Sequence, residues 1–361
     1  NYQDIGFQYY LYTIAGLKID KCYLMCVDSS YVRHGDIDPC KLLKKIDVTK
    51  EVKSKYSKTI EDNIAEMVKA IKAKTYFEPG IGTHCHEPYE CPLVEKCWSF
   101  LPDRNVFLLY RNNILPIKLI KDGILDLTEI PKETKMSDKN RIQVACEKTG
   151  KPYVDNKKIK KFLKEIKYPA YYMDFETIGS AVPLFDNSRP YQQIPFQFSV
   201  HIVKQKGAAP EHYSFLADGA DDPRPKFMEK LKLVMGTQGS VISYNAGFES
   251  SKLKECAEAL PKYKKWVESI EERIVDLLEP FQDFAYYHPK QDGSCSIKNV
   301  LPTLTDKSYD DMEIGDGMTA SREYFRVTFT DDNKDMAKIR NNLEQYCGLD
   351  TLGMVEIVNQ L

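Results

Sequence analysis

Downstream of residue 169, the order of hydrophobic and polar positions predicts a clear series of strands and helices. Short runs rich in aromatic and β-branched residues indicate strands, and apolar residues three or four positions apart indicate helices. The expected strands are 170–175, 195–203, 211–216 and 240–244; the expected helices are 223–235, 249 to about 270, a short one from Ser296 and a long one from about 333. Three strands followed by helix, strand and helix predict an α/β sheet with helices on its faces.

Residues 1–168 have a less regular pattern. It predicts an amphipathic helix that stops near Gly16, a strand over about 21–26 and a helix over 56–75. The segment "KKIKKFLKEIKYP" ends a mixed region and favours a boundary before Pro169. Because the chain opens in the middle of a pattern, its first part resembles the second half of a domain. We expect a partial domain over 1–104, a helical connector over 105–168 and a complete domain over 169–361.

Composition narrows the class of protein. The 361 residues are 42% hydrophobic and 29% charged, which is typical of a folded globular chain. No apolar run approaches the roughly 20 residues of a membrane span, and no secretory leader is recognised, so we expect a cytoplasmic protein that binds no membrane. A net charge of -2 excludes a globally basic nucleic-acid binder, but not a local basic patch beside an acidic metal site.

Two acids interrupt the apolar run "YYMDFETIGS". Strand alternation directs Asp174 and Glu176 to one face and Phe175 to the other. Two unpaired carboxylates on a half-buried face repel each other, and a divalent cation removes that cost. The alternative is a solvated strand end that carries two surface acids.

Two further acids and a tyrosine stand at informative positions. Glu249 follows a predicted strand end, four residues after Asn245, at the kind of strand-to-helix junction where α/β sheets hold ligands. Tyr346 and Asp350 are four residues apart on the predicted terminal helix and therefore share one face. Each also has a structural alternative: a first-turn acid that favours the helix dipole, and a core tyrosine with an acidic partner.

Taken together, this order resembles the DnaQ-like exonucleases of the ribonuclease H fold, in the subtype with a tyrosine in the last motif, over roughly residues 169–361. Gln345 stands where the histidine subtype has its base. The resemblance implies that four acids hold two Mg²⁺ or Mn²⁺ ions, that Tyr346 orients the attacking water, and that nucleoside 5′-monophosphates are released from a 3′ end. The acids are Asp174, Glu176, Glu249 and Asp350. Most relatives have aspartate where this chain has Glu249.

The expected substrate is single-stranded or 3′-ended DNA or RNA. Uncharged amides and an aromatic ring in "RPYQQIPFQFSVH" suit a terminal nucleotide, and a lysine in the first turn of a helix suits a phosphate. The candidate substrate-binding residues are Tyr191, Gln193, Gln197, Asn245 and Lys298. The alternatives are a polar edge strand and a surface lysine. A different class of function is also open: a nucleic-acid-binding or assembly module of a DNA repair or defence complex, with little or no turnover.

The stretches "RPYQQIPFQFSVH" and "SIKNVLP" also resemble a bacterial family of uncharacterised domains fused behind RecB-like nucleases. Gln8 and Tyr12, one helical turn apart, resemble the Q-x-x-x-Y helix of that nuclease family. The acids and lysine that normally precede this helix are absent, so we expect the first domain to be catalytically silent. The sequence names no helicase or repair partner.

Cysteines recur every six residues in "GTHCHEPYECPLVEKCW". Three thiols at this spacing can converge on one metal, whereas a continuous helix would scatter them. The resemblance to iron-sulfur members of the RecB-like group implies a four-iron cluster on Cys85, Cys91 and Cys97; zinc is the alternative metal, and buried free thiols are the structural alternative. The candidates for a fourth ligand within the chain are Cys22, Cys26, Cys40, His84 and His86.

Overall fold

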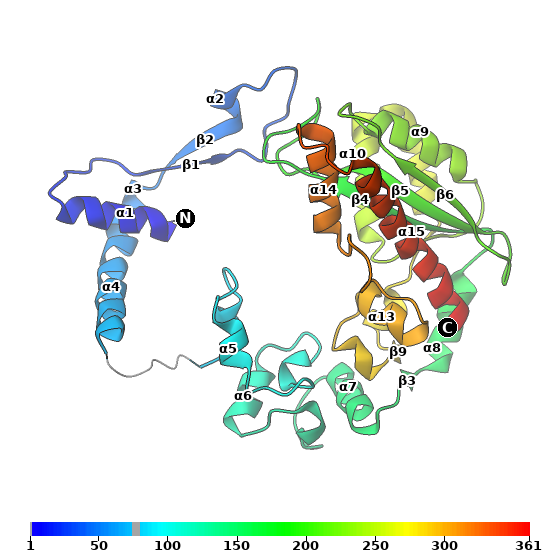
Figure 1. The fold of residues 1–361 in the computed structure, drawn as a ribbon, viewed down its shortest axis with the longest axis horizontal. Helices are drawn as coiled ribbons and strands as arrows, with labels where there is room; N and C mark the ends of the chain where they lie inside the picture. Colours follow the sequence, from blue (N-terminus) through cyan, green and yellow to red (C-terminus); the bar gives the residue numbers. More distant parts are fainter. Residues whose placement is uncertain (1, 74–79) are drawn as a thin grey trace. The chain divides into compact units, whose positions relative to one another are not determined.

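The computed structural model describes residues 2–73 and 80–361 (Figure 1). They form two compact units, one of residues 1–80 with 180–192 and one of residues 81–179 with 193–361. This division differs from the boundaries predicted at 104 and 168, because the expected connector packs into the larger unit and the segment 180–192 packs into the smaller one.

The larger unit is built on a mixed five-stranded sheet with the strand order β6-β5-β4-β7-β8. Its strands are β4 (Ala170–Ile178), β5 (Ile194–Val203), β6 (Glu211–Leu216), β7 (Val241–Ser243) and β8 (Ile274–Asp276). The first three in chain order pair antiparallel, whereas β7 is parallel to both β4 and β8. The central strand β4 therefore has neighbours on both sides.

Helices cover both faces of this sheet (Figure 1). On one face, apolar residues of β4 and β5 pack against α9 (Arg224–Val234), α10 (Gly247–Ala259) and α11 (Lys264–Glu271), with Phe175 in this core. On the other face lie α14 (Gly317–Phe329) and the long α15 (Met336–Gln360). Phe196 of β5 stacks on Tyr324 of α14 with ring centroids 3.8 Å apart. The acids of β4 lie on this second face.

The region before the sheet is helical and belongs to the same unit. Its elements are 3₁₀ turns at Thr83–Cys85, Val106–Leu108 and Leu127–Glu129, the helices α5 (Val94–Trp98), α6 (Leu115–Lys121), α7 (Asp138–Thr149) and α8 (Asn156–Glu165), and the strand β3 (Tyr153–Val154). Tyr110 and Cys146 share a small core with Phe284 and Tyr287, and Arg104 bonds to both Glu147 and Asp292. These contacts explain why the predicted connector is not separate.

Shorter elements complete the larger unit. They are the 3₁₀ turns Pro261–Tyr263 and Pro289–Gln291, α12 (Glu279–Gln282), β9 (Tyr286–Tyr287), which pairs with β3, and α13 (Ile297–Leu304). The predicted helix 249–270 is interrupted between α10 and α11, where Leu260 leaves the helical conformation and Pro261 follows. The strand β8 and the helix α14 have no counterpart in the sequence prediction.

The smaller unit contains α1 (Tyr2–Ile14), the antiparallel pair β1 (Tyr23–Val27) and β2 (Leu43–Asp47), α2 (Pro39–Leu42), α3 (Thr49–Glu51), a π-helical turn over Val52–Tyr56 and α4 (Ser57–Lys72). Cys22, Val48 and Val52 form its core. Arg33 donates hydrogen bonds to the carbonyls of Pro183 and Leu184, which explains why 180–192 groups with this unit. The end of the predicted helix 56–75 lies outside the described residues.

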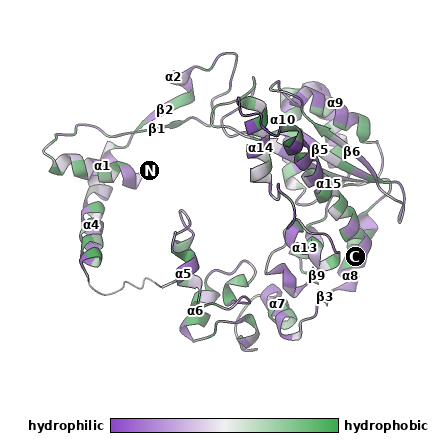
Figure 2. Ribbon diagram, viewed as in Figure 1, coloured by the Kyte–Doolittle hydropathy of each residue, from purple (hydrophilic) through white to green (hydrophobic). Residues whose placement is uncertain are grey.

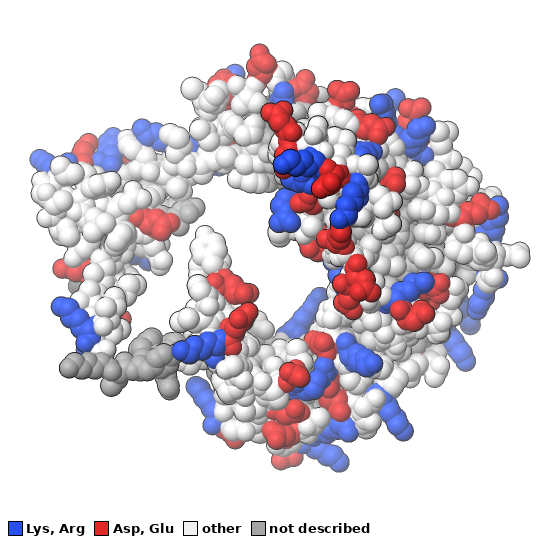
Figure 3. Space-filling model, in the orientation of Figure 1, with Lys and Arg blue, Asp and Glu red and all other residues white. Residues whose placement is uncertain are grey.

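Polar residues are frequent throughout the described helices. Figure 2 shows hydrophilic positions interrupting the hydrophobic ones along α15, the longest of them. In the part of the chain that the structure describes, no helix combines the length and the apolar character that a membrane crossing needs. On the face drawn in Figure 3, positive and negative side chains are interspersed over the surface.

Candidate metal centre

The strand β4 carries the first two acids. As its alternation predicts, Asp174 and Glu176 point to the face covered by α15, while Phe175 points to the opposite core. Glu176 is buried, and Asp174 is half-buried. A register shift interrupts the pairing with β5 directly after Glu176. Aromatic and apolar neighbours hold this strand at the centre of the sheet, so both carboxylates are fixed by a rigid element.

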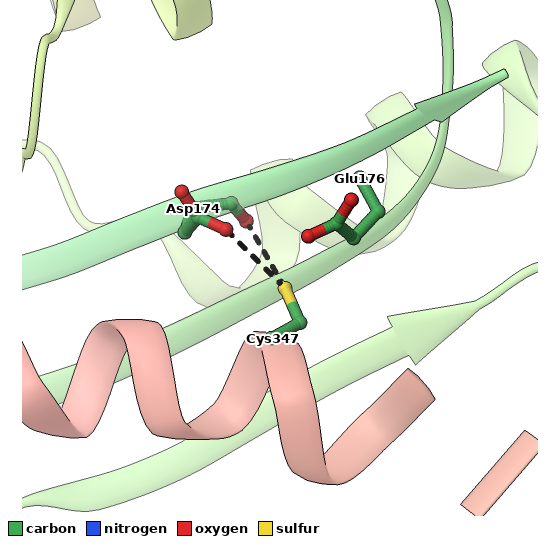
Figure 4. A group of neighbouring side chains, drawn as sticks. All are labelled: Asp174, Glu176 and Cys347. Atoms are coloured by element: carbon green, nitrogen blue, oxygen red, sulfur yellow. Dashed lines mark hydrogen bonds between the residues drawn. The ribbon is translucent and has the colours of Figure 1, made fainter. Parts of the chain in front are cut away.

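The helix α15 supplies a second group of side chains. Tyr346, Cys347 and Asp350 are all buried. The Cys347 thiol lies 3.7 Å from Oδ2 and 3.8 Å from the backbone oxygen of Asp174. One ligand atom each of Asp174, Glu176 and Cys347 lies within 4.8 Å of the other two. Figure 4 shows Cys347 pointing from α15 toward the two carboxylates on β4.

Asp350 has a partner that the sequence did not indicate. The Tyr309 hydroxyl donates a 2.6 Å hydrogen bond to Oδ1 of Asp350. Tyr309 is buried, in the segment that joins α13 to α14. The Lys298 ammonium bonds to the carbonyl of Gly315 in the same segment and lies 5.4 Å from the Tyr346 ring centroid. The hydrogen bond between Tyr309 and Asp350 forms because the segment between α13 and α14 returns to α15. No local sequence pattern predicts this return.

Glu249 lies in the first turn of α10 and is buried. Its Oε2 atom has no hydrogen-bond partner among the residues that the structure describes. The preceding turn is shaped by Asn245, whose backbone is left-handed at φ 69° and whose N–H donates to the Asp276 carboxylate. A buried oxygen without a partner is unusual in a folded protein and calls for a ligand or another explanation.

The four acids Asp174, Glu176, Glu249 and Asp350, which we call the carboxylate cluster, influence one another electrostatically. Burial raises the pKa of every one of them. For Asp174, the charges of the other three raise the pKa further. The pKa of Glu249 is raised to about 8, with Asp276 and Asp350 adding to burial. The pKa of Asp350 is raised to about 6, opposed by the Tyr309 hydrogen bond and the Lys298 charge.

Tyr346 and Cys347, one helical turn before Asp350 on α15, stay protonated near neutral pH. Burial and then the charges of the neighbouring carboxylates raise the pKa of the Tyr346 phenol far above its usual range. Burial and Asp174 do the same to the pKa of the Cys347 thiol. Tyr346 is therefore a hydrogen-bonding group and not a base in this setting.

The donor set fits divalent cations. Oxygens of buried carboxylates are the ligands that Mg²⁺ and Mn²⁺ prefer, and a cation offsets the repulsion that raises these pKa values. Glu249 Oε2 is available to such an ion because none of the described residues bonds to it. Lys298 is the cation whose charge acts on both Glu176 and Asp350, and it leaves the cluster net negative.

The predicted substrate-binding residues have different surroundings. Tyr191 is exposed and belongs to the smaller unit, and Gln193 and Asn245 are exposed as well. Gln197 is fully buried, and its Nε2 donates a 2.8 Å hydrogen bond to the carbonyl of Leu343. Its side chain lies between β5 and α15, and a substrate contact by Gln197 stays a prediction. Lys298 remains close to the cluster.

In the described part of the chain, the sulfurs of Cys85, Cys91 and Cys97 do not all lie within 4.8 Å of one another. Among the described residues, the group of ligand atoms within 4.8 Å of one another is the one at Asp174, Glu176 and Cys347. The Cys91 N–H donates to the Cys85 carbonyl, which closes a loop, but Cys97 lies on the following helix α5. Among the candidates for a fourth ligand, His84 and His86 flank Cys85, and Cys22, Cys26 and Cys40 belong to the smaller unit. A metal on these cysteines stays a prediction.

Gln8 and Tyr12 lie one turn apart on α1, as the sequence predicts, and both are exposed. A helix with these two side chains on its surface is compatible with the Q-x-x-x-Y resemblance and equally with a plain surface helix. The silent RecB-like domain therefore also stays a prediction.

Comparison with known proteins gives similarities to proteins without a stated activity. A family model described as a domain of unknown function, DUF2779, matches residues 171–296, which include Asp174, Glu176 and Glu249.

The chain is similar to "Uncharacterized protein MG366 homolog" of Mycoplasma pneumoniae, with 29% identity over 221 residues, 55% of this chain and 33% of the relative. It is also similar to "Uncharacterized protein UU173" of Ureaplasma parvum, with 26% identity over 223 residues, 54% of this chain and 31% of the relative. The chain thus spans about a third of the length of these relatives. No solved structure matches it significantly. Residues 171–296 are accordingly similar to the DUF2779 family, and the match covers the strand and the helix that carry three of the four acids.

Proposed function

We propose that this chain is a metal-dependent 3′-to-5′ exonuclease that hydrolyses nucleic-acid phosphodiester bonds. The observation that carries the proposal is the carboxylate cluster. Three elements far apart in the sequence, β4, α10 and α15, contribute buried acids that act on one another's pKa values. A stable fold rarely accumulates buried like charges without a use for them.

The fold is compatible with this function. The central strand β4 carries the first two acids, the hairpin-like pair β5 and β6 lies on one side of it with β5 antiparallel to β4, and the parallel strands β7 and β8 lie on the other. With a helix across the acidic face, this arrangement supports a ribonuclease H-like domain over residues 169–361. A partial RecB-like domain before it, with a cysteine-bound iron-sulfur cluster or zinc ion, is the second part of the proposal. A brown colour of the purified protein would favour iron-sulfur over zinc.

The chain's own residues have distinct roles in this proposal. Asp174, Glu176, Glu249 and Asp350 hold two Mg²⁺ or Mn²⁺ ions, which supply activation of water and neutralisation of charge on the phosphate. Tyr309 holds Asp350 in place through its hydrogen bond. Tyr346, protonated at neutral pH, orients the attacking water by hydrogen bonding.

Lys298 is the phosphate contact in this proposal. It lies in the first turn of α13, whose cap Ser296 accepts a hydrogen bond from the Lys298 N–H. A helix N-terminus and an ammonium group both favour an anion. Its charge also acts on Glu176 and Asp350, so it lies close enough to the cluster to serve a phosphate there.

The test is incubation with 3′-labelled single-stranded DNA or RNA in the presence of Mn²⁺. We expect stepwise shortening that EDTA stops and that Asp174→Asn abolishes. Asp310→Asn is the matched control, because Asp310 is an exposed acid next to Tyr309 that does not belong to the carboxylate cluster. The absence of shortening, or shortening that survives Asp174→Asn, would refute the proposal.

A binding module without turnover is the second candidate, and Glu249 is the observation that favours it. Its side chain is one methylene longer than the aspartate of the exonucleases that the sequence resembles, and within the described part of the chain its Oε2 is without a partner. Metal-independent binding of the labelled strand without shortening would favour this candidate. Restored shortening in Glu249→Asp would show that the longer side chain is the cause.

A further inference from the structure

Cys347 is a sulfur ligand built into an otherwise oxygen-based site. It is fully buried on α15, and the chain places it between Tyr346 and Asp350. Its Sγ lies 3.7 Å from Oδ2 of Asp174 and, with Glu176, completes a group whose ligand atoms are all within 4.8 Å of one another (Figure 4). Among the described residues, no second group of three or more such ligands is this compact.

The third member of the group, Glu176, is influenced by the Lys298 charge but has no direct hydrogen-bond partner among the described residues. Glu176 is 6% exposed, and none of the described residues donates a hydrogen bond to its carboxylate. In Figure 4 this carboxylate lies beside the Cys347 sulfur. A buried carboxylate that accepts no hydrogen bond is costly in its charged form, and a bound cation would stabilise it. This argument is independent of the position of the Cys347 thiol.

The spacing suits an ion that accepts both sulfur and oxygen. Zinc in tetrahedral sites binds sulfur at about 2.3 Å and carboxylate oxygen at about 2.0–2.2 Å, so a sulfur and an oxygen on the same ion lie about 3.6 Å apart. The observed distance from Cys347 Sγ to Asp174 Oδ2 is 3.7 Å. Mg²⁺ does not gain from the sulfur, because it is a hard cation that prefers oxygen.

We propose that Asp174, Glu176 and Cys347 form a binding site for a thiophilic dication of the Zn²⁺ and Cd²⁺ class. Binding replaces the thiol proton, which leaves to solvent, with a sulfur–metal bond. No oxidant or reductant takes part. The site shares both of its carboxylates with the carboxylate cluster, so the two kinds of ion compete for it.

Competition at shared carboxylates makes the site inhibitory, a consequence that rests on the proposed nuclease function. An ion held by the Cys347 sulfur occupies Asp174 and Glu176 in a three-ligand geometry different from the all-oxygen arrangement of Mg²⁺ or Mn²⁺. Low concentrations of free Zn²⁺ would therefore stop strand shortening in excess Mn²⁺, and a chelator selective for zinc would restore it.

The binding itself is tested on the full chain without any substrate. Titration with Cd²⁺ is followed by the ultraviolet sulfur-to-cadmium charge-transfer band, in the wild type, in Cys347→Ser and in Cys256→Ser. Cys256 is the matched control, because it is equally buried but lies in the apolar core of α10. We expect the charge-transfer band of Cys347→Ser to be weaker than that of Cys256→Ser by the intensity that one sulfur ligand contributes. Equal bands in all three proteins would overturn the proposal.

A competition experiment measures the selectivity. Mn²⁺ bound to the protein is followed by electron paramagnetic resonance while buffered free Zn²⁺ is raised. The compared quantity is the free Zn²⁺ concentration that displaces half of the bound Mn²⁺, corrected for each protein's own Mn²⁺ affinity. We expect this concentration to be at least about tenfold higher in Cys347→Ser than in the wild type, which is the scale on which single contacts of a metal site act. An unchanged ratio would overturn the proposal.

Two further outcomes keep the inference separate from the nuclease proposal. If the wild type binds no Mn²⁺, the nuclease proposal fails, and the cadmium band alone decides the inference. If Cys347→Ser does not fold, wild-type crystals soaked with Cd²⁺ decide it: anomalous density bonded to Cys347 Sγ supports the site, and density confined to other cysteines overturns it.

Discussion

The Tyr309 phenol donates a 2.6 Å hydrogen bond to Oδ1 of Asp350, across 41 residues of sequence. It joins the segment between α13 and α14 to the helix that closes the acidic face of the sheet. Since the other acids of the cluster lie on β4 and α10, the orientation of Asp350 decides whether its second oxygen is presented to the same ion. Tyr309 is therefore the positioning residue of the cluster.

Replacing this phenol should weaken cation binding. In Tyr309→Phe, Asp350 loses its hydrogen bond but keeps its packing, and we expect the Mn²⁺ affinity to fall by about 10-fold or more, as for other groups that orient metal ligands. Isothermal titration calorimetry measures this. Tyr213→Phe is the control, because Tyr213 is exposed on β6 and bonds to Glu211. Equal affinities in the two variants would contradict the role of Tyr309.

The buried acids should make the metal-free protein less stable as the pH rises. The folded-state pKa of Glu249 is raised from 4.5 to about 8, so below pH 4.5 the acid is protonated in both states and costs nothing. Between these values the unfolded chain ionises first, and stability falls with rising pH by about 1.4 kcal/mol per pKa unit. Thermal unfolding in EDTA at pH 5 and pH 8 measures this loss, and added Mn²⁺ should reverse it.

The same reasoning predicts a stabilising substitution. Glu249→Gln removes the buried charge and should raise the melting temperature in EDTA at pH 8, by about 2–4 °C for each kcal/mol recovered. Glu258→Gln, at an exposed position of the same helix, should leave it unchanged. A lower melting temperature for Glu249→Gln would show that Glu249 is stabilised by contacts that this account does not contain.

A hydrogen-bonded network on the acidic face should contribute to stability. The Thr351 hydroxyl lies 2.6 Å from Ser199 Oγ and 2.8 Å from His201 Nδ1, which ties α15 to β5. Thr351→Val keeps the shape but removes the hydroxyl partner of His201 Nδ1, whereas Ser199 Oγ keeps its 2.9 Å contact with His212 Nε2. We expect a cost of about 1–3 kcal/mol from the buried imidazole nitrogen. Urea unfolding measures the change. Thr330→Val, at an exposed site, should cost clearly less.

His201 should make this network sensitive to acid. Burial, and then the nearby His212, lower the pKa of His201 to about 4 from its usual 6.5. Above pH 6.5 the imidazole is neutral in both states. Between about 6.5 and 4 only the unfolded chain takes up the proton, so stability falls as the pH falls. In His201→Gln the drop in unfolding free energy between pH 7 and pH 5 should be smaller than in the wild type. An equal drop would assign the acid sensitivity to other groups.

Local periodicity predicted the parts of the site that depend on a single element. Alternation along β4 separates Asp174 and Glu176 from Phe175, and helical spacing sets Tyr346 and Asp350 on one face of α15. Both follow from the geometry of one strand or one helix. For the same reason, the four predicted strands begin and end within a few residues of the observed strands β4, β5, β6 and β7.

Features that depend on long-range contacts were not predictable in this way. β8 has three residues that are all only partly buried, and it is recognised by its pairing with β7. The role of Tyr309 depends on a loop that returns to α15. Gln197 was predicted to face a nucleotide because it is polar, but its partner is the carbonyl of Leu343, 146 residues away. Because Gln197 alternates with the apolar Phe198 and Val200, the sequence indicates that it points away from their core, toward the face that α15 covers.

The most direct test of the central claim is anomalous diffraction from crystals soaked with Mn²⁺. The account predicts manganese density bonded to the carboxylates of Asp174 and Asp350, with Glu176 and Glu249 completing the ligands. Crystals with no manganese within bonding distance of these four acids, or with the Asp350 carboxylate turned away from Asp174, would contradict it.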